Sequence, residues 1–362
     1  MKKIIISGGG TGGHIFPAIA IAKAIAAALP ESEILFVGAK NRMEMEKVPA
    51  AGYPIKGLWI SGLQRSFSIQ NFLFPVKVIN SLWNARKIIR QFKPNIAIGV
   101  GGYASGPLLY AAADAKVSCL IQEQNSYPGI TNKILAAKVQ KICVAYQNME
   151  KFFPTEKLVL TGNPVRPEIA SLHNIVKTED LYAKWQLTKQ KPVVLLIGGS
   201  LGARSLNNAI AEQIAHWQNS DLQLIWQTGK YYYEQYKHHA SKNIHPMPFI
   251  TDMNEAYALS DVVISRAGAL SISELQVAQK AAILVPSPNV AEDHQTKNAQ
   301  ALVQNNAAEW IKDDVVNEQL FEKVQTLITD TQKRQLLEEN IAKMAKPHAA
   351  QQIVQIALEL AS

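Results

Sequence analysis

A glycine-rich loop followed by a histidine is the segment of this sequence with the clearest chemical potential. Gly8–His14 reads Gly-Gly-Gly-Thr-Gly-Gly-His, and it lies between the apolar run Ile4–Ile6 and the alanine-rich segment Pro17–Leu29. This order predicts a strand, a glycine loop and a helix, with backbone amides at the helix N-terminus that favour an anion. The imidazole of His14 adds a titratable base at the mouth of the loop. A tight turn with a surface histidine is the alternative interpretation.

Two further glycine loops follow predicted strands. Gly101–Pro107 comes after the predicted strand 96–100, and Gly198–Ala203 comes after the predicted strand 193–197. Ligands bind at the carboxyl ends of the strands in α/β sheets, so all three loops mark candidate ligand sites.

The first loop does not predict a dinucleotide or a metal cofactor. Gly8, Gly10 and Gly13 fit G-x-G-x-x-G, but the predicted strand 34–38 is followed by Ala-Lys and lacks the carboxylate of the NAD fingerprint. The chain has no P-loop motif and no Asp-x-Asp pair that would hold a diphosphate through a divalent metal. We therefore predict no metal and no cofactor, and we expect helix amides and cations to stabilise a leaving diphosphate.

The second half of the chain supplies candidates for that role. Arg166, Ser200 with its loop amides, and the segment Arg266–Ser271 could all meet a diphosphate. Glu274 lies one turn into the helix predicted from about residue 269, where a carboxylate can accept both hydroxyls of a ribose. Alternatively, Glu274 only complements the helix dipole.

The elements that position these residues alternate between short apolar strands and helices, which predicts parallel sheets with crossover helices. With 362 residues, two domains are expected, and the pattern restarts after a linker with two prolines. We predict a first domain over 1–163, a second over 164–345, and a last helix within 346–362 that crosses back to the first. Two such domains leave a cleft. The predicted strands are 3–7, 34–38, 96–100, 117–121, 141–145, 193–197, 222–226, 262–264 and 282–285, and the predicted helices include 17–29, 130–137, 206–217, 270–279 and 348–360.

The composition limits the classes of partner. Lys and Arg number 37 against 29 Asp and Glu, so the net charge is +8 and an anionic partner is expected. No aromatic-basic motif supports a nucleic acid, which leaves phosphates or an acidic membrane surface. Two cysteines, Cys119 and Cys143, predict a reducing compartment without a disulfide framework. We find no signal peptide and no apolar run near the ~18 residues that would span a bilayer.

A helix predicted over 75–91 has two apolar faces. The face containing Val78, Leu82, Ala85 and Ile89 is expected to meet the core. The other face carries apolar side chains backed by cations, which suits the interface of an anionic membrane, although a broader contact with the core is the alternative. The candidate membrane-facing residues are Phe72, Leu73, Phe74, Val76, Ile79 and Trp83, followed by the cations Arg86, Lys87 and Arg90.

Six motifs occur in an order that resembles a known family. The chain resembles the MurG family, the undecaprenyldiphospho-muramoylpentapeptide β-N-acetylglucosaminyltransferases of the family 28 type, from residue 3 to the last helix, and no motif position departs from the pattern. The motifs are Gly9–His14, Glu123–Asn125, Gly162–Arg166, Gly198–Ala203, Gly268–Glu274 and Asp293–Gln295.

The resemblance implies a GT-B fold, with two Rossmann-like domains whose parallel sheets face a deep cleft. It implies transfer of GlcNAc from UDP-GlcNAc to the C4 hydroxyl of MurNAc in lipid I, with inversion, to give lipid II. It also implies a peripheral enzyme at the cytoplasmic face of the cell membrane.

The resemblance also assigns roles to residues. His14 is expected to be the catalytic base, or else to bind the acceptor diphosphate, and His294 is a weaker candidate for the base. The first glycine loop borders the donor sugar and diphosphate, Glu274 binds the ribose, and Gln295 reads the GlcNAc hydroxyls. The expected donor-binding residues are Thr11, Gly12, Gly13, Asn125 beside the sugar, Arg166 and Ser200 on the diphosphate side, Ile250 with its backbone on the uracil, Ala269, Leu270, Ser271, Ile272, Ser273, Glu274 and Gln295.

Two other functions fit the same donor site. A UDP-GlcNAc 2-epimerase would turn over UDP-GlcNAc without a lipid acceptor and would not need an exposed apolar helix. A non-catalytic protein that binds a sugar nucleotide at the membrane would bind UDP-GlcNAc tightly without transfer.

Overall fold

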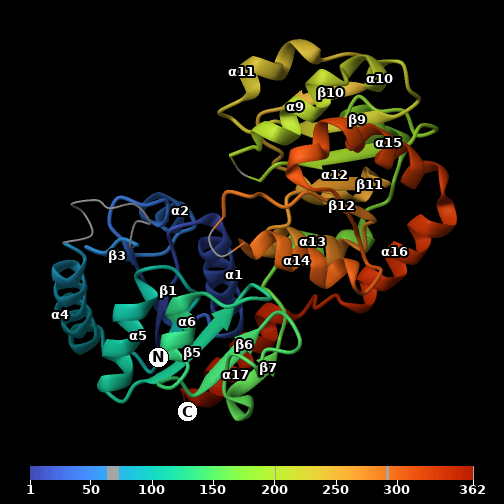
Figure 1. Cartoon of the computed structure of the whole chain (residues 1–362). Helices are drawn as coiled ribbons and strands as arrows, with labels where there is room; N and C mark the ends of the chain where they lie inside the picture. Colours follow the sequence, from blue (N-terminus) through green and yellow to red (C-terminus); the bar gives the residue numbers. More distant parts are fainter. Residues whose placement is uncertain (63–72, 200, 291–292, 362) are drawn as a thin grey trace. The chain divides into compact units, whose positions relative to one another are not determined.

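The computed structural model describes residues 1–62, 73–199, 201–290 and 293–361, and it divides into two compact units (Figure 1). Unit 1 comprises Met1–Val165 and His348–Ser362, and unit 2 comprises Arg166–Pro347. Each unit contains one parallel sheet with helices on both faces, as expected for a doubly wound α/β fold.

The sheet of unit 1 has seven parallel strands in the order β3-β2-β1-β4-β5-β6-β7. Ser7 at the end of the first strand pairs with Val37 on one side and Gly99 on the other, so three strands end at nearly the same level. This register places the loops that follow them at one edge of the sheet. The strands are β1 (Lys3–Ser7), β2 (Glu33–Ala39), β3 (Ile55–Leu58), β4 (Ile96–Gly99), β5 (Ser118–Glu123), β6 (Lys141–Val144) and β7 (Leu158–Leu160).

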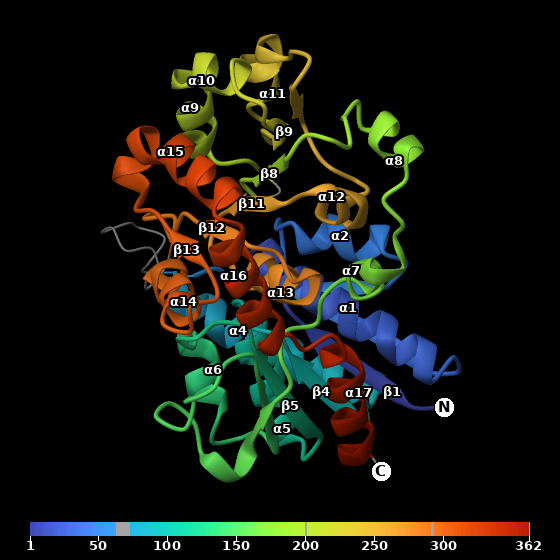
Figure 2. The same ribbon diagram turned by 90° about the vertical axis from the view of Figure 1, so that its right-hand side faces the viewer.

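Alternate side chains of these strands enter two separate cores. Ile5 packs into the core under α4, α5 and α6, whereas Ile4 and Ile6 pack under α1 and α17. The last helix, α17, therefore belongs to unit 1 and packs beside α1 although it follows unit 2 in sequence (Figure 2). The helices are α1 (Gly12–Ala28), α2 (Glu44–Ala50), α4 (Phe74–Phe92), α5 (Ser105–Asp114), α6 (Ile130–Leu135) and α17 (Ala349–Leu360).

The first helix begins earlier than its sequence indicates. The alanine-rich pattern predicts a start at Pro17, but α1 starts at Gly12 with Thr11 as its N-cap residue. Pro17 lies inside the helix, where it lacks the N–H that would donate to the Gly13 carbonyl; Gly13 is exposed, so water can satisfy that carbonyl. The earlier start places His14 in the first helical turn.

The sheet of unit 2 has six parallel strands in the order β10-β9-β8-β11-β12-β13. One face is covered by α9, α10, α15 and α16, and the other carries α12 and α13. The strands are β8 (Val193–Ile197), β9 (Gln223–Gln227), β10 (Ile244–Met247), β11 (Val262–Ser265), β12 (Ala282–Leu284) and β13 (Glu309–Trp310). The helices are α7 (Pro167–Ala170), α8 (Glu179–Lys184), α9 (Arg204–Glu212), α10 (Ile214–Gln218), α11 (Tyr233–Tyr236), α12 (Met253–Leu259), α13 (Ala269–Ala278), α14 (His294–Val303), α15 (Val316–Thr329) and α16 (Thr331–Lys343).

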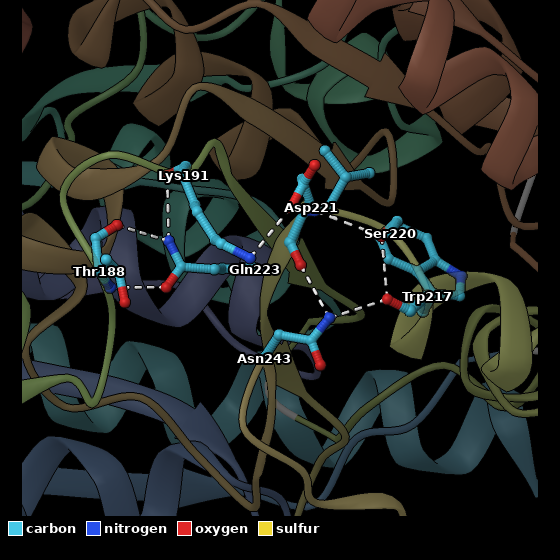
Figure 3. Close-up of polar contacts among 8 residues, drawn as sticks. Thr188, Lys191, Trp217, Ser220, Asp221, Gln223 and Asn243 are labelled. Atoms are coloured by element: carbon cyan, nitrogen blue, oxygen red, sulfur yellow. Dashed lines mark hydrogen bonds and ion pairs between the residues drawn. The ribbon is translucent and has the colours of Figure 1, made fainter.

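A network of polar contacts fixes the amino-terminal end of β9 (Figure 3). This end of the strand is opposite the carboxyl ends of the strands, where the third glycine loop, Gly198–Ala203, follows β8. Gln223 accepts from the Thr188 amide at 2.6 Å and donates to the Thr188 and Lys191 carbonyls at 2.8 and 3.0 Å. Asn243 donates to the carbonyls of Trp217 and Leu222 at 2.9 and 3.1 Å. These amide side chains tie the loop before β8 and the end of α10 to the sheet, so they stabilise the fold and lie outside the predicted site.

Candidate functional site

Two glycine loops of unit 1 pack directly against each other at the carboxyl ends of β1 and β4. Gly101 and Gly102 have φ angles of +90° and +87°, which only glycine adopts readily. A Cβ on Gly102 would overlap the Gly9 carbonyl, and a Cβ on Gly101 would lie 2.7 Å from Cδ2 of His14. Both glycines are therefore needed for the second loop to pack against the first loop and the His14 ring.

Contacts to the His14 ring define its tautomer. Nδ1 lies 3.1 Å from the Gly9 carbonyl oxygen and 3.3 Å from Oγ1 of Thr11. A carbonyl oxygen only accepts, so the contact with Gly9 requires the proton on Nδ1. In the neutral ring the lone pair is then on Nε2, which can take a proton from a bound hydroxyl.

A buried polar network positions Asn125 beside the second loop. Glu123 Oε1 accepts from the Asn125 amide at 3.0 Å, and Oε2 accepts from Asn132 Nδ2 at 2.8 Å. Gln124 donates to the Val100 carbonyl at 2.9 Å, which joins the end of β5 to the residue before the second loop. Burial raises the pKa of Glu123, while the hydrogen bonds from Asn125, Asn132 and Gly129 act in the opposite direction.

Sequence reasoning missed two buried carboxylates in this unit. Glu123 occurs in one of the family motifs without a role of its own, and no sequence pattern singles out Glu44. Glu44 is fully buried and accepts from the Gly10 amide and the Ala39 amide, both at 2.9 Å. The only local signal is that a glutamate follows a strand end, and its partner Gly10 is 34 positions away in the chain.

In unit 2 the third glycine loop packs on the loop that follows β9. Gly202 and Gly229 have φ angles of +81° and +86°, and a Cβ on either one would overlap the backbone of the other loop. Gln227 donates to the Gly199 carbonyl at 3.0 Å and accepts from the Ile250 amide at 3.1 Å. Because the Ile250 amide is engaged, the backbone group that Ile250 can present to a uracil is its carbonyl. Ser200 lies outside the described residues.

Arg166 and Glu274, which were expected to contact different parts of a nucleotide, contact each other. Arg166 Nε and Nη2 donate to the two Glu274 oxygens at 2.8 and 2.9 Å, a bidentate pair. Tyr257 Oη donates to Glu274 Oε2 at 3.3 Å. Burial, followed by the charge of Glu274, raises the pKa of Tyr257 well above its usual value, so the hydroxyl remains a donor. A ribose would therefore meet a carboxylate whose oxygens already accept hydrogen bonds.

The start of α13 offers backbone amides more than side chains. Gly268 is its N-cap residue, and no side chain caps the helix. Ala269, Ile272 and Ser273 are buried, whereas Leu270 and Ser271 are half-buried. Ile272 is completely buried and packs into the interior, so it does not present a side chain to a ligand. What this segment offers an anion is the free N–H groups of its first turn.

Arg266, one of the cations proposed for a diphosphate, has a structural role. Its guanidinium donates to the Val285 carbonyl at 3.0 Å and pairs with Asp313, which also accepts from Ser205 Oγ at 2.7 Å. Only 12% of the Arg266 side chain is exposed. These contacts tie β11 to the segment after β12 and to the 3-10 turn before α15, so the guanidinium of Arg266 is already engaged within the unit.

Gln295 lies in the first turn of α14, a helix that packs against α13. Its Oε1 accepts from the Ser287 amide at 2.9 Å, which orients the side-chain NH₂ as the group available to a sugar hydroxyl. Asp293, the N-cap residue, has a φ angle of +53°.

Within the described residues, no group of three or more His, Cys, Asp or Glu side chains could hold a metal ion. Cys119 and Cys143 are both free and buried, and burial raises the pKa of each thiol to about 12.

Helix α4 exposes the apolar face that the sequence analysis predicted to face a membrane. Ile79 is 69% exposed and Trp83 63%, with Leu73 and Val76 also exposed, so the alternative of a broader core contact is wrong for these four residues. Phe74 is half-buried, and Phe72 lies outside the described residues. Lys87 Nζ lies 5.8 Å from the centroid of the Trp83 ring.

The buried face of α4 agrees with the prediction in part and is wider than predicted in its first two turns. Val78 is half-buried and packs against the core, and Ala85 and Ile89 are buried, as predicted; Leu82 is only half-buried, and Lys77 and Ser81 are buried as well. Their polar atoms donate to Ser61 Oγ and the Trp59 carbonyl at 2.9 and 3.0 Å, because the segment after β3 covers this side of the helix. In the described ranges, no helix is both long enough and apolar enough to cross a membrane.

Comparisons with known proteins agree over both units. Residues 4–144 match the glycosyltransferase family 28 N-terminal domain, and residues 193–353 match the glycosyltransferase family 28 C-terminal domain. A protein of Cytophaga hutchinsonii is 54% identical over 99% of this chain and 96% of its own, and one of Parabacteroides distasonis is 53% identical over 97% and 96%. Both are named UDP-N-acetylglucosamine–N-acetylmuramyl-(pentapeptide) pyrophosphoryl-undecaprenol N-acetylglucosamine transferase.

Solved structures show the same architecture. The crystal structure of MurG from Acinetobacter baumannii superposes with a TM-score of 0.77 at 30% identity, covering 99% of this chain and all of the other. A UDP-GlcNAc 2-epimerase from Neisseria meningitidis bound to UDP-GlcNAc superposes with a TM-score of 0.66 at 15% identity, over 99% of this chain and all of the other. The second likeness is one of fold alone.

Proposed function

Since the chain belongs to glycosyltransferase family 28, we propose that it transfers GlcNAc from UDP-GlcNAc to the C4 hydroxyl of MurNAc in undecaprenyl-diphospho-MurNAc-pentapeptide, lipid I, and gives lipid II. The observation that carries the proposal is the 54% identity to a transferase of that name over 99% of the chain. The test is purified protein with UDP-GlcNAc and a short-chain lipid I analogue, monitored for the disaccharide product.

The two alternatives are outcomes of the same experiment. Turnover of UDP-GlcNAc without the lipid acceptor would indicate an epimerase, and the likeness to epimerases in fold alone does not favour that result. Tight binding of UDP-GlcNAc without transfer would indicate a binding protein.

The proposed reaction is a single in-line displacement with inversion at the anomeric carbon. The acceptor hydroxyl gives its proton to Nε2 of His14, and its oxygen forms the new bond to C1 of GlcNAc. The bond from C1 to the diphosphate oxygen breaks, and its electron pair leaves with UDP. Nδ1 keeps its proton throughout and donates it in a hydrogen bond to the Gly9 carbonyl, so the ring becomes an imidazolium without changing its orientation.

The donor-binding roles of this proposal are assigned to residues of each unit separately. UDP is assigned mainly to unit 2, with the amides at the start of α13, Arg166 and Ser200 toward the diphosphate, Glu274 toward the ribose and Gln295 toward the sugar. Support comes from the free first turn of α13 and from the oriented amide of Gln295. Thr11, Gly12, Gly13 and Asn125 of unit 1 are assigned to the donor sugar and diphosphate.

We expect transfer to continue in excess EDTA. No Asp-x-Asp pair occurs in the sequence, and the described residues contain no cluster of metal-ligating side chains, so helix amides and cations would stabilise the leaving diphosphate. The measurement is the rate of disaccharide formation after extensive chelation. Loss of activity that magnesium or manganese restores would contradict this mechanism.

The exposed face of α4 is assigned to the membrane, with the protein peripheral at its cytoplasmic side. Its apolar side chains are neighboured by Arg86, Lys87 and Arg90, all exposed, and a lipid-linked acceptor must be met at the bilayer surface.

We expect Trp83→Glu to reduce binding to anionic vesicles while turnover of a soluble acceptor analogue changes little. The substitution replaces an apolar side chain that is 63% exposed with a charge that the lipid surface repels. Co-sedimentation with phosphatidylglycerol vesicles measures the effect. Leu336→Glu, which adds the same charge at an exposed residue of α16 in unit 2, is the matched control. Equal vesicle binding by wild type and Trp83→Glu would remove the membrane assignment.

A further inference from the structure

One peptide group of the first glycine loop joins two side chains from different elements. The carbonyl of Gly9 accepts from Nδ1 of His14 at 3.1 Å. The N–H of Gly10 belongs to the same peptide group, and it donates to Oε2 of Glu44 at 2.9 Å. The result is a continuous chain of hydrogen bonds from a carboxylate, through a peptide, to an imidazole.

The loop is built around this carboxylate. Glu44 is fully buried, and its other oxygen accepts from the Ala39 amide at 2.9 Å, so both oxygens act as acceptors in the way that an ionised carboxylate does. A Cβ on Gly9 or on Gly38 would overlap the Glu44 side chain, so both glycines make room for it. Glu44 is also the first residue of α2, where the positive end of the helix dipole favours a negative charge.

The same contact removes one amide of the first loop, that of Gly10, from any role in binding a phosphate. In such a cradle the loop amides point to the ligand, but the Gly10 amide points inward to Glu44. A buried negative charge directly behind the loop disfavours an anion at this peptide and favours a cation on its other side. The imidazolium that His14 becomes after it takes a proton is such a cation.

We propose that Glu44 is a positioning residue for His14 and acts through the peptide between Gly9 and Gly10. By accepting the Gly10 N–H, the carboxylate polarises the peptide and makes the Gly9 carbonyl a stronger acceptor for Nδ1–H. This fixes the tautomer with the lone pair on Nε2 and stabilises the imidazolium, as a carboxylate bonded directly to a histidine does in other enzymes. The inference rests on the proposed role of His14 as the base.

The elements packed against this peptide and ring contribute Tyr103 and Gly101 besides Glu44. Tyr103, from the loop after β4, lies beside Gly10. Glu44 comes from α2 and His14 from α1, while the second loop meets the ring through Gly101. Removal of the Glu44 charge is therefore expected to affect His14 directly, with Tyr103 left in place.

The test is Glu44→Gln, measured in two ways on the full-length protein. Gln keeps the shape but loses the charge and places an NH₂ against one of the two backbone N–H donors. We expect kcat to fall about tenfold, the lower end of losses seen when the partner that orients a histidine is removed. The acid side of the pH–rate profile should move to lower pH, because the imidazolium loses stabilisation.

Nitrogen-15 NMR of the histidine ring measures the tautomer and the pKa of His14 directly, without an activity assay. The His14 signal is assigned among the eight histidines by its loss in His14→Gln. In the wild type we expect the Nδ1–H tautomer, and in Glu44→Gln a mixture of tautomers together with a lower pKa of the ring. This readout tests the inference even if His14 proves not to be the base, in which case His14→Gln would retain activity.

Two further variants separate charge from geometry. Glu46→Gln removes the same charge from the exposed side of α2, where the side chain is 78% exposed, and should leave the His14 signals unchanged. Glu44→Asp keeps the charge but is shorter by one methylene. It should therefore lower the pKa of His14 less than Glu44→Gln does. If Glu44→Gln lowers kcat while the tautomer and titration of His14 stay as in the wild type, Glu44 only supports the loop and the proposal is overturned.

Discussion

We expect His14→Ala to lower kcat by about 10²- to 10⁴-fold, the usual contribution of general acid–base catalysis. The reason is the geometry of the ring: Nδ1–H donates to the Gly9 carbonyl, so in the neutral ring Nε2 carries the lone pair that can accept the proton of the acceptor hydroxyl. UDP-GlcNAc affinity should change little, because the base contacts the acceptor and not the uridine. In the wild type, kcat should fall on the acid side of neutral pH as a proton occupies Nε2.

His14→Gln separates the base from a binding residue. Gln can donate a hydrogen bond to an acceptor diphosphate from nearly the same place as Nε2, but it cannot accept the proton. If His14 is the base, His14→Gln should be as slow as His14→Ala. Near-normal turnover by His14→Gln would leave His14 as a ligand of the acceptor. Calorimetry with UDP-GlcNAc on both variants is the control for folding and for the donor site.

The second large effect is expected at the other unit, where Glu274→Ala should weaken UDP-GlcNAc binding by about 1–3 kcal/mol. The carboxylate is 14% exposed and held by Arg166 and Tyr257, so it is prepared to accept ribose hydroxyls through its remaining lone pairs. Calorimetry with UDP and with 2′-deoxy-UDP measures the effect. The deoxy compound should bind more weakly to the wild type, and this difference should disappear in Glu274→Ala.

Arg166 has to be controlled for, because Glu274→Ala also leaves its guanidinium without a partner. A double-mutant cycle with Arg166→Ala separates the two contributions. If Glu274 acts on the ribose itself, Glu274→Ala should still weaken binding when Arg166 is already Ala. Unchanged nucleotide affinity in Glu274→Ala would reject its assignment to the ribose, and the pair with Arg166 would then serve only to hold α13 to the start of unit 2.

Most strands of the two sheets could be predicted because a buried parallel strand appears in the sequence as a short, continuous apolar run. Runs such as Val193–Ile197 are apolar throughout, since both faces of the strand are covered, and glycine loops mark where several strands end. The strands that escaped prediction, β3, β7, β10 and β13, are short and lie at the sheet edges, and all but β7 carry polar residues or proline. The predicted helix 206–217 is interrupted at Gln213, which separates α9 from α10.

The sequence by itself determined the family, the α/β class of the fold and the positions of its glycine loops, because each is written in contiguous residues. The tertiary structure decided which polar groups face each other. Arg166 meets Glu274 across 108 positions, Gln122 meets Asn163 across 41, and Glu44 meets the first loop across 34. No local pattern records such pairs, since the topology of the sheet brings their elements together, and a buried charge or amide must then find its partner there.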